Sequence, residues 1–172
     1  MPELSNESRQ LVQRYLSRRG LLGASAAAAG ASLFFGFART RDIQAQQLTG
    51  DSLYDQLGGI VGITKVIQDF VANVAADDRI VHFFVPAVQA GRIPRLTELL
   101  IQQVAAASGG PVTYTGGSMK AVHAGMGITT ADFTALVEDL VMAMDANNVP
   151  AGPKNTLLGA LGPLAADIVE VP

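Results

Sequence analysis

The sequence predicts an all-α fold from about residue 48 to the end of the chain. Apolar residues recur there at three- and four-residue spacing, which is typical of helices that bury one face. Glycine pairs and prolines separate these segments, and none of the segments alternates clearly as a half-buried strand would. With 172 residues, 49% of them hydrophobic, the chain can form one domain with a sizeable core and an appendage.

The first part of this domain is predicted to hold three main helices. A short one over 51–57 begins at Asp51 or Ser52 and ends at Gly58-Gly59. A second, over 60–76, has an apolar stripe formed by Ile63, Val66 or Ile67, Phe70, Val71 and Val74. Residues 76–84 follow as a turn and short helix, and residues 85–94 as a loop with two prolines. The third helix, over 93–107, carries on one face Leu96, Leu99, Leu100 and Val104.

The second part is predicted to begin with an extended, glycine-rich loop over 108–117. About two helical turns follow and end at Gly125 and Gly127. Thr129 or Thr130 then caps a strong helix to about 147, whose inward residues are Phe133, Leu136, Val137, Leu140, Val141 and Met144. The last helix, over about 153–169, should be kinked by Pro163 and is apolar at Leu157, Leu158, Leu161, Leu164 and Ile168.

Composition excludes several kinds of site. The chain has no cysteine, which removes thiolate zinc sites, iron–sulfur clusters and thioether-linked haem. Two histidines in all cannot form a multi-histidine metal site within one chain. From Gln46 onward there are 6 basic and 12 acidic residues, so this part has a net charge of −6 and is not expected to bind nucleic acid.

Residues 1–47 are predicted to be an export signal or anchor, separate from the domain over 48–172. An Arg-bearing segment precedes a stretch without charge from Gly20 to Ala38, and charged residues follow it. Ser17, Arg18-Arg19 and Leu21-Leu22 resemble the twin-arginine signature, which implies the twin-arginine translocase as a partner. Cleavage is expected after Ala45 or, second, after Ala38. The alternative is a membrane anchor, and either one places the domain in the periplasm or on the outer face of the inner membrane.

His123 is the residue that most invites a chemical role. It lies in the stretch "SMKAVHAGMGITTADF", on a helix too short and too flanked by glycine to be stable alone. A bond to a metal or cofactor would hold such a helix in place. An ordinary structural or exposed histidine is the competing interpretation from spacing alone.

The region from Ser52 to Val169 resembles the group I truncated haemoglobins. The resemblance is carried, in order, by "SLYDQLGG", "DF", "ADDR", "FF", "GGP", "YTG", "MKAVHAGMGIT" and "GPLAADIV". It implies a two-over-two helical sandwich around b-type haem, with His123 as the proximal iron ligand and Phe84 packed on the haem plane. It also makes Tyr114, Lys120 and Arg95 candidates for binding the haem propionates, or otherwise solvated side chains.

The distal side departs from the pattern of that family. Many members have a Tyr and a Gln that donate hydrogen bonds to bound oxygen, and the matching residues here are Val71 and Leu100. Leu96, at the distal gate position, is also apolar. Loss of both donors removes about 1–3 kcal/mol of charge-assisted hydrogen bonding to oxygen. Gln102 or Gln103 could supply a donor if the register of the helix shifts.

Other titratable and sulfur-containing residues have structural interpretations. His82 could be a sixth iron ligand, but a solvated or capping role is favoured. Asp77-Asp78 and Glu138-Asp139 are expected to be solvated, because adjacent helix residues do not face each other. The methionines at 126, 142 and 144 are expected to fill gaps in the core.

These observations leave three classes of function. The first is a haem globin that reversibly binds oxygen, CO or NO. The second is a haem enzyme on the same scaffold, acting on nitric oxide or peroxide with the help of an unidentified reductase. The third is a helical envelope module without a cofactor.

Overall fold

The computed structural model describes Gln10 and residues 52–171. The export signal predicted within residues 1–47 lies outside the described residues, apart from Gln10, and stays a prediction. In chain order the helices are α3 (Leu53–Gln56), α4 (Gly59–Ala76), the 3-10 helix η1 (Val81–Phe84), α5 (Val85–Gln89), α6 (Ile93–Ala107), α7 (Met119–His123), α8 (Thr130–Ala146), α9 (Ala151–Leu161), the 3-10 helix η2 (Gly162–Leu164) and α10 (Ala165–Ile168). Over residues 52–171 the fold is therefore all-α, as predicted.

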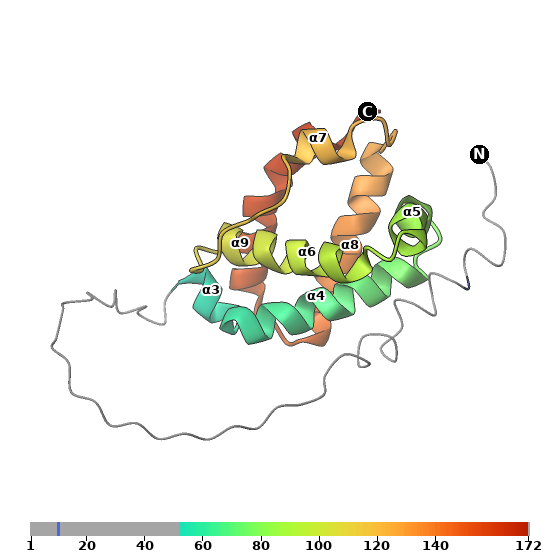
Figure 1. The fold of residues 1–172 in the computed structure, drawn as a ribbon. Coiled ribbons are helices and arrows are strands. Elements are labelled where there is room, and N and C mark those ends of the chain that lie inside the picture. Colours follow the sequence, from blue (N-terminus) through green and yellow to red (C-terminus); the bar gives the residue numbers. More distant parts are fainter. Residues whose placement is uncertain (1–9, 11–51, 172) are drawn as a thin grey trace, which may run out of the picture.

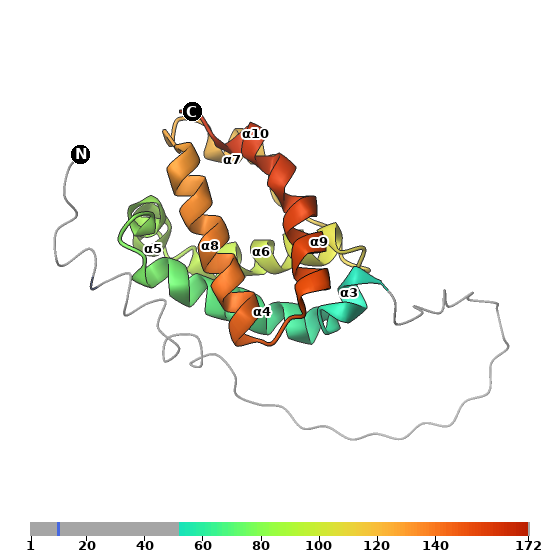
Figure 2. The same cartoon turned by 180° about the vertical axis from the view of Figure 1, so that it is seen from behind.

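The long helices form two pairs that cross each other. Helices α4 and α6 lie side by side, and α8 and α9 extend away from them toward the short helix α7 (Figures 1 and 2). Helix α8 packs against α4, and α9 packs against α6 and α8. Helix α7 lies at the other end of α8 and α9 from α4, where it packs against α10 (Figure 2). The molecule thus has a broad core at the α4 end and a sparsely packed α7 end.

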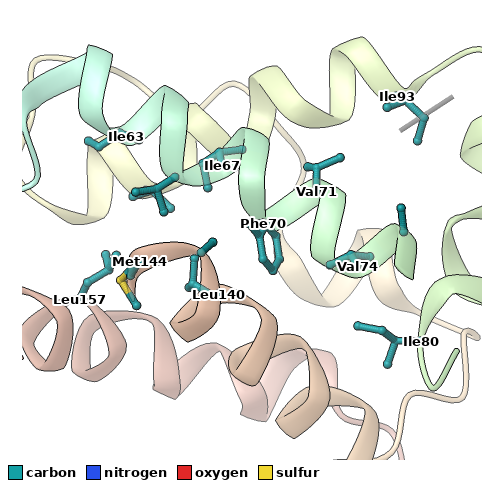
Figure 3. Packing of buried hydrophobic residues seen from close by; sticks show 14 of the residues in the cluster. Ile63, Ile67, Phe70, Val71, Val74, Ile80, Ile93, Leu140, Met144 and Leu157 are labelled. Carbon is teal, nitrogen blue, oxygen red and sulfur yellow. The ribbon is translucent and has the colours of Figure 1, made fainter. Parts of the chain in front are cut away.

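Helix α4 supplies the centre of the core because it packs against both α8 and α6. Phe70 points toward Leu140 of α8, whereas the next residue, Val71, points toward α6 and Ile93 (Figure 3). One step of about 100° along a helix places consecutive side chains on different faces in this way. The side chains that are less than 2% exposed include Ile63, Ile67, Val74, Ile80, Ile93, Met144 and Leu157. Burial of each such side chain contributes about 1.5–3 kcal/mol, so the α4 end carries most of the stability of the fold.

Helix boundaries follow the predicted caps closely. Ser52 caps α3 by accepting a hydrogen bond from the Asp55 N–H, at 3.1 Å. Thr129 caps α8 through a reciprocal capping box with Asp132. The last helix breaks at Gly162–Leu164, which confirms the kink predicted at Pro163.

The loop predicted for residues 85–94 is wrong over its first half, because helix α5 occupies Val85–Gln89, whereas residues 90–92 connect α5 to α6 without a helix. Pro86 lies in the first turn of this helix, where a proline needs no N–H partner and suits the backbone. Val85 and Val88 are buried and attach α5 to the core.

Two other expectations also need correction. Asp139 was expected to be solvated with Glu138, yet its side chain is buried at 1% exposure, while Glu138 is exposed. The fourth residue on either side of Asp139 is a buried alanine, Ala135 or Ala143, so the helix turns the carboxyl inward. Met144 is a core residue as predicted, but Met142 is 51% exposed.

Candidate functional site

His123 is held in a defined orientation at the end of α7. Its Nδ1 atom lies 2.8 Å from the main-chain oxygen of Met119, one turn earlier in the helix. A carbonyl oxygen only accepts, so Nδ1 must carry the proton and donate it. The lone pair of the neutral ring then lies on Nε2, which is the nitrogen available to a metal. The ring of His123 is half-buried, and its bond to Met119 fixes the orientation of the ring on α7.

An apolar hollow lies between α4, η1 and α6, and four of the residues predicted for the site meet there. Val71, Phe84, Leu96 and Leu100 line it together with three residues that the sequence did not single out for the site, namely Phe70, Val74 and Ile93. Val74 follows Phe70 and Val71 by one helical turn, and this spacing is the signal that could have found it. No lining side chain of the hollow offers a hydrogen-bond donor.

The distal glutamines do not supply a donor to the hollow. The side-chain Oε1 atom of Gln102 accepts hydrogen bonds from the Thr115 N–H at 3.0 Å and from the Thr115 hydroxyl at 2.8 Å. Gln102 also donates to Glu98, at 3.2 Å. Its amide is therefore engaged between α6 and the extended loop, and Gln103 does not line the hollow either.

The three residues predicted to bind propionates lie apart from the apolar lining. Arg95 forms an ion pair with Glu98 at 2.7 Å and donates to the Thr115 hydroxyl at 2.9 Å. Tyr114 is half-buried in the loop, and its hydroxyl rests so close to Gly116 that a side chain there would come within 2.1 Å of it. Lys120 is exposed on α7, one turn before His123. The three residues thus come from α6, the extended loop and α7, and none of them lines the hollow.

The second histidine has a different environment. His82 is in η1, and its ring lies 4.0 Å from the ring of Phe83, tilted by 38°. It does not line the apolar hollow. This position supports the structural interpretation of His82 over a role as a sixth ligand.

Comparison with known proteins identifies the family. The bacterial-like globin family matches residues 52–170. The group 1 truncated haemoglobin GlbN of Mycolicibacterium paratuberculosis is 38% identical over 117 residues, which cover 68% of this chain and 83% of that protein. GlbN of a Synechocystis strain is 30% identical over 103 residues, covering 58% of this chain and 80% of that protein.

Solved structures agree with this assignment. The 2/2 haemoglobin of Synechococcus, solved in the cyanomet state with covalently attached haem, superposes with a TM-score of 0.62 at 27% identity, covering 69% of this chain and 98% of that one. The truncated haemoglobin of Tetrahymena pyriformis in its Fe(III) form has the same fold, with a TM-score of 0.64 at 24% identity and the same coverage. Residues 52–170 of this chain therefore belong to the bacterial-like globins and form a group 1 truncated haemoglobin domain.

Proposed function

We propose that the chain binds one b-type haem without a covalent bond, with His123 as proximal ligand, and that it reversibly binds a diatomic gas. The observation that carries the proposal is the hydrogen bond from His123 Nδ1 to Met119, because it leaves Nε2 free for iron. The absence of cysteine excludes a thioether link to the haem.

The side chains of the site fit a haem in their chemistry. The imidazole of His123, the apolar wall with Phe84, and the polar side chains Tyr114, Lys120 and Arg95 are the kinds of group that bind a flat, apolar molecule carrying carboxylates. Haem iron, when bound, supplies the coordination position at which a diatomic gas attaches. The ligation and the contacts to the propionates are parts of this proposal.

The distal residues determine what kind of gas binding this chain favours. Val71, Leu96 and Leu100 give the hollow an apolar lining and donate no hydrogen bond. A gas ligand that depends on charge-assisted hydrogen bonds is retained less well there, by about 1–3 kcal/mol, than one that does not. We therefore expect fast oxygen dissociation and a relative preference for CO. This expectation favours reversible binding over the enzymatic alternative, which needs a long-lived oxygen complex.

The test is an absorption spectrum of the purified full-length protein titrated with haemin, then reduced and exposed to CO. We expect saturation at one haem per chain and an intense, CO-sensitive band. His123→Ala should remove or shift that band, whereas His82→Ala, the matched control, should leave it unchanged. A protein that takes up no haem, or a His123→Ala variant with the wild-type spectrum, would overturn the proposal and favour the cofactor-free module.

We also propose that the domain is exported by the twin-arginine translocase. The pair Arg18-Arg19 before an uncharged stretch supports this proposal. The test is a fusion of residues 1–47 to a reporter protein that is active only when it is exported in the folded state. We expect this segment to direct export of the reporter. Replacement of both arginines by lysine should stop it, and export that persists in that variant would contradict the proposal.

A further inference from the structure

The helix that carries His123 has little support of its own. Helix α7 contains five residues, none of them buried, and isolated helices of this length are not stable in water. Its N-terminus is capped by Ser118, whose hydroxyl accepts from the Ala121 N–H at 3.3 Å. Its C-terminus leads at once into the loop 124–128. Besides the packing of α7 against α10, the position of His123 therefore depends on what holds this loop.

A single carboxylate from the C-terminal segment holds the loop. The Glu170 Oε1 atom accepts a hydrogen bond from the Gly125 N–H, and Oε2 accepts one from the Gly127 N–H, both at 2.6 Å. Gly125 and Gly127 have φ angles of +78° and +66°, which glycine adopts at no steric cost. This backbone conformation allows two nearby N–H groups to reach one carboxylate. The two bonds also hold the pKa of Glu170 below its usual value, so the charged acceptor is retained.

Glu170 is itself fixed in place by the main chain around it. The N–H groups of Glu170 and Val171 both donate to the Ile128 oxygen, at 2.9 and 3.1 Å. The Thr130 N–H donates to the Val171 oxygen at 3.2 Å, where α8 begins. Ile168 and Ile128 are each 7% exposed, and Thr129 and Val171 form an isolated parallel β-bridge. The carboxylate is therefore presented to the loop by a segment attached to both α8 and α10.

We propose that Glu170 is a positioning residue for His123. By binding the N–H groups two and four residues after the histidine, it fixes the end of α7 and thereby the direction in which Nε2 points. The inference rests on the proposed role of His123 as the proximal ligand. It assigns to the C-terminal segment a part in setting the strength and uniformity of the bond to iron.

The test compares Glu170→Ala and Glu170→Gln with a matched control, Asp167→Asn, which removes the charge of another exposed carboxylate near the C-terminus. Glutamine keeps the shape of the side chain but places an NH₂ against one of the two N–H groups. The main readout is the iron–histidine stretching band of the full-length ferrous protein in resonance Raman spectra. The second is the rate of haem transfer to an excess of apomyoglobin.

We expect the iron–histidine stretching band to shift or broaden in both Glu170 variants. Haem transfer should accelerate about tenfold or more, because hydrogen bonds to a charged acceptor are lost. Asp167→Asn should match the wild type in both measurements. A wild-type band in Glu170→Gln overturns the inference even if haem transfer accelerates, because loss of stability alone would produce that result. If Glu170→Ala does not fold, the band of Glu170→Gln decides. Failure of the wild type to bind haem through His123 would instead refute the proposed function.

Discussion

Replacement of Asp139 by Asn is predicted to stabilise the protein at neutral pH. Asp139 is 1% exposed, and among the described residues its Oδ2 atom has no hydrogen-bond partner. Burial raises its pKa to about 6, and the charges of Asp77 and Glu138 add to this effect while Arg79 opposes it. Asparagine has nearly the same shape and carries no charge. The change therefore removes the cost of a buried charge and leaves the packing of α8 intact.

The size and the sign of the effect follow from the pKa. A rise from 3.8 to about 6 corresponds to about 3 kcal/mol. Because neighbouring groups and water relax around a buried charge, we expect about half of that value, ~1.5 kcal/mol. The folded-state pKa lies above the unfolded value. Below pH 3.8 the carboxyl of Asp139 is protonated in both states and does not lower the free energy of unfolding. As the pH rises through the folded pKa, the buried carboxyl becomes charged and the free energy of unfolding falls. The loss is complete above about pH 7.

The assay is urea unfolding of the wild type and Asp139→Asn from pH 4.0 to 7.5, at equal haem content. The difference in the free energy of unfolding should be small at pH 4.0 and reach about 1.5 kcal/mol at pH 7.5. Glu138→Gln is the matched control, since it removes a neighbouring charge whose exposed ion pair contributes about 0–1 kcal/mol. A difference that does not vary with pH, or a wild type more stable than the variant at pH 7.5, would refute the reasoning.

Three further predictions concern packing, the distal hollow and a helix cap. Gly62→Ala should lower the free energy of unfolding by about 1–3 kcal/mol, because the added Cβ would lie 2.1 Å from the Leu57 oxygen. Gly159→Ala has open space around it and should raise the free energy of unfolding by up to about 1 kcal/mol. Thermal or urea unfolding measures both. Val71→Tyr combined with Leu100→Gln should slow oxygen dissociation about five- to hundredfold in stopped-flow measurements, and an equal slowing of CO dissociation would contradict the hydrogen-bond explanation. Thr129→Ala should lower the free energy of unfolding by about 1 kcal/mol in urea, because it removes half of the capping box, and an unchanged midpoint would contradict that role.

The helices could be predicted from the sequence because their signals are local. Ser52 and Thr129 cap the helices that follow them, and Pro163 breaks the last one, each through contacts within a few residues. Helix α5 was missed because five residues are too few to show a period, and Pro86 suits a loop as well as a first turn. Local chemistry therefore fixes the long elements and leaves short ones ambiguous.

The candidate site could be predicted in part for the same reason. Helical periodicity predicted that Val71, Leu96 and Leu100 face inward, and the resemblance to the group I truncated haemoglobins named them as residues of the site, where they line the hollow. The partners of Glu170 and the burial of Asp139 depend on contacts between residues far apart in the chain, such as the 45 positions between Gly125 and Glu170. No local pattern marks such contacts, and a charged residue is by default expected in solvent.

The two sides of the site are held by different forces, and this difference determines how each can be changed. The distal wall belongs to α4 and α6, whose buried side chains support the whole fold. The side that carries His123 is the five-residue helix α7, which packs against α10 and continues into a loop that Glu170 binds through two hydrogen bonds. Exchange of Val71 or Leu100 therefore has to preserve core packing, and it should alter ligand kinetics more than haem retention. Changes at Glu170 leave the core intact and act on the orientation of His123, so haem retention and the iron–histidine bond should respond first.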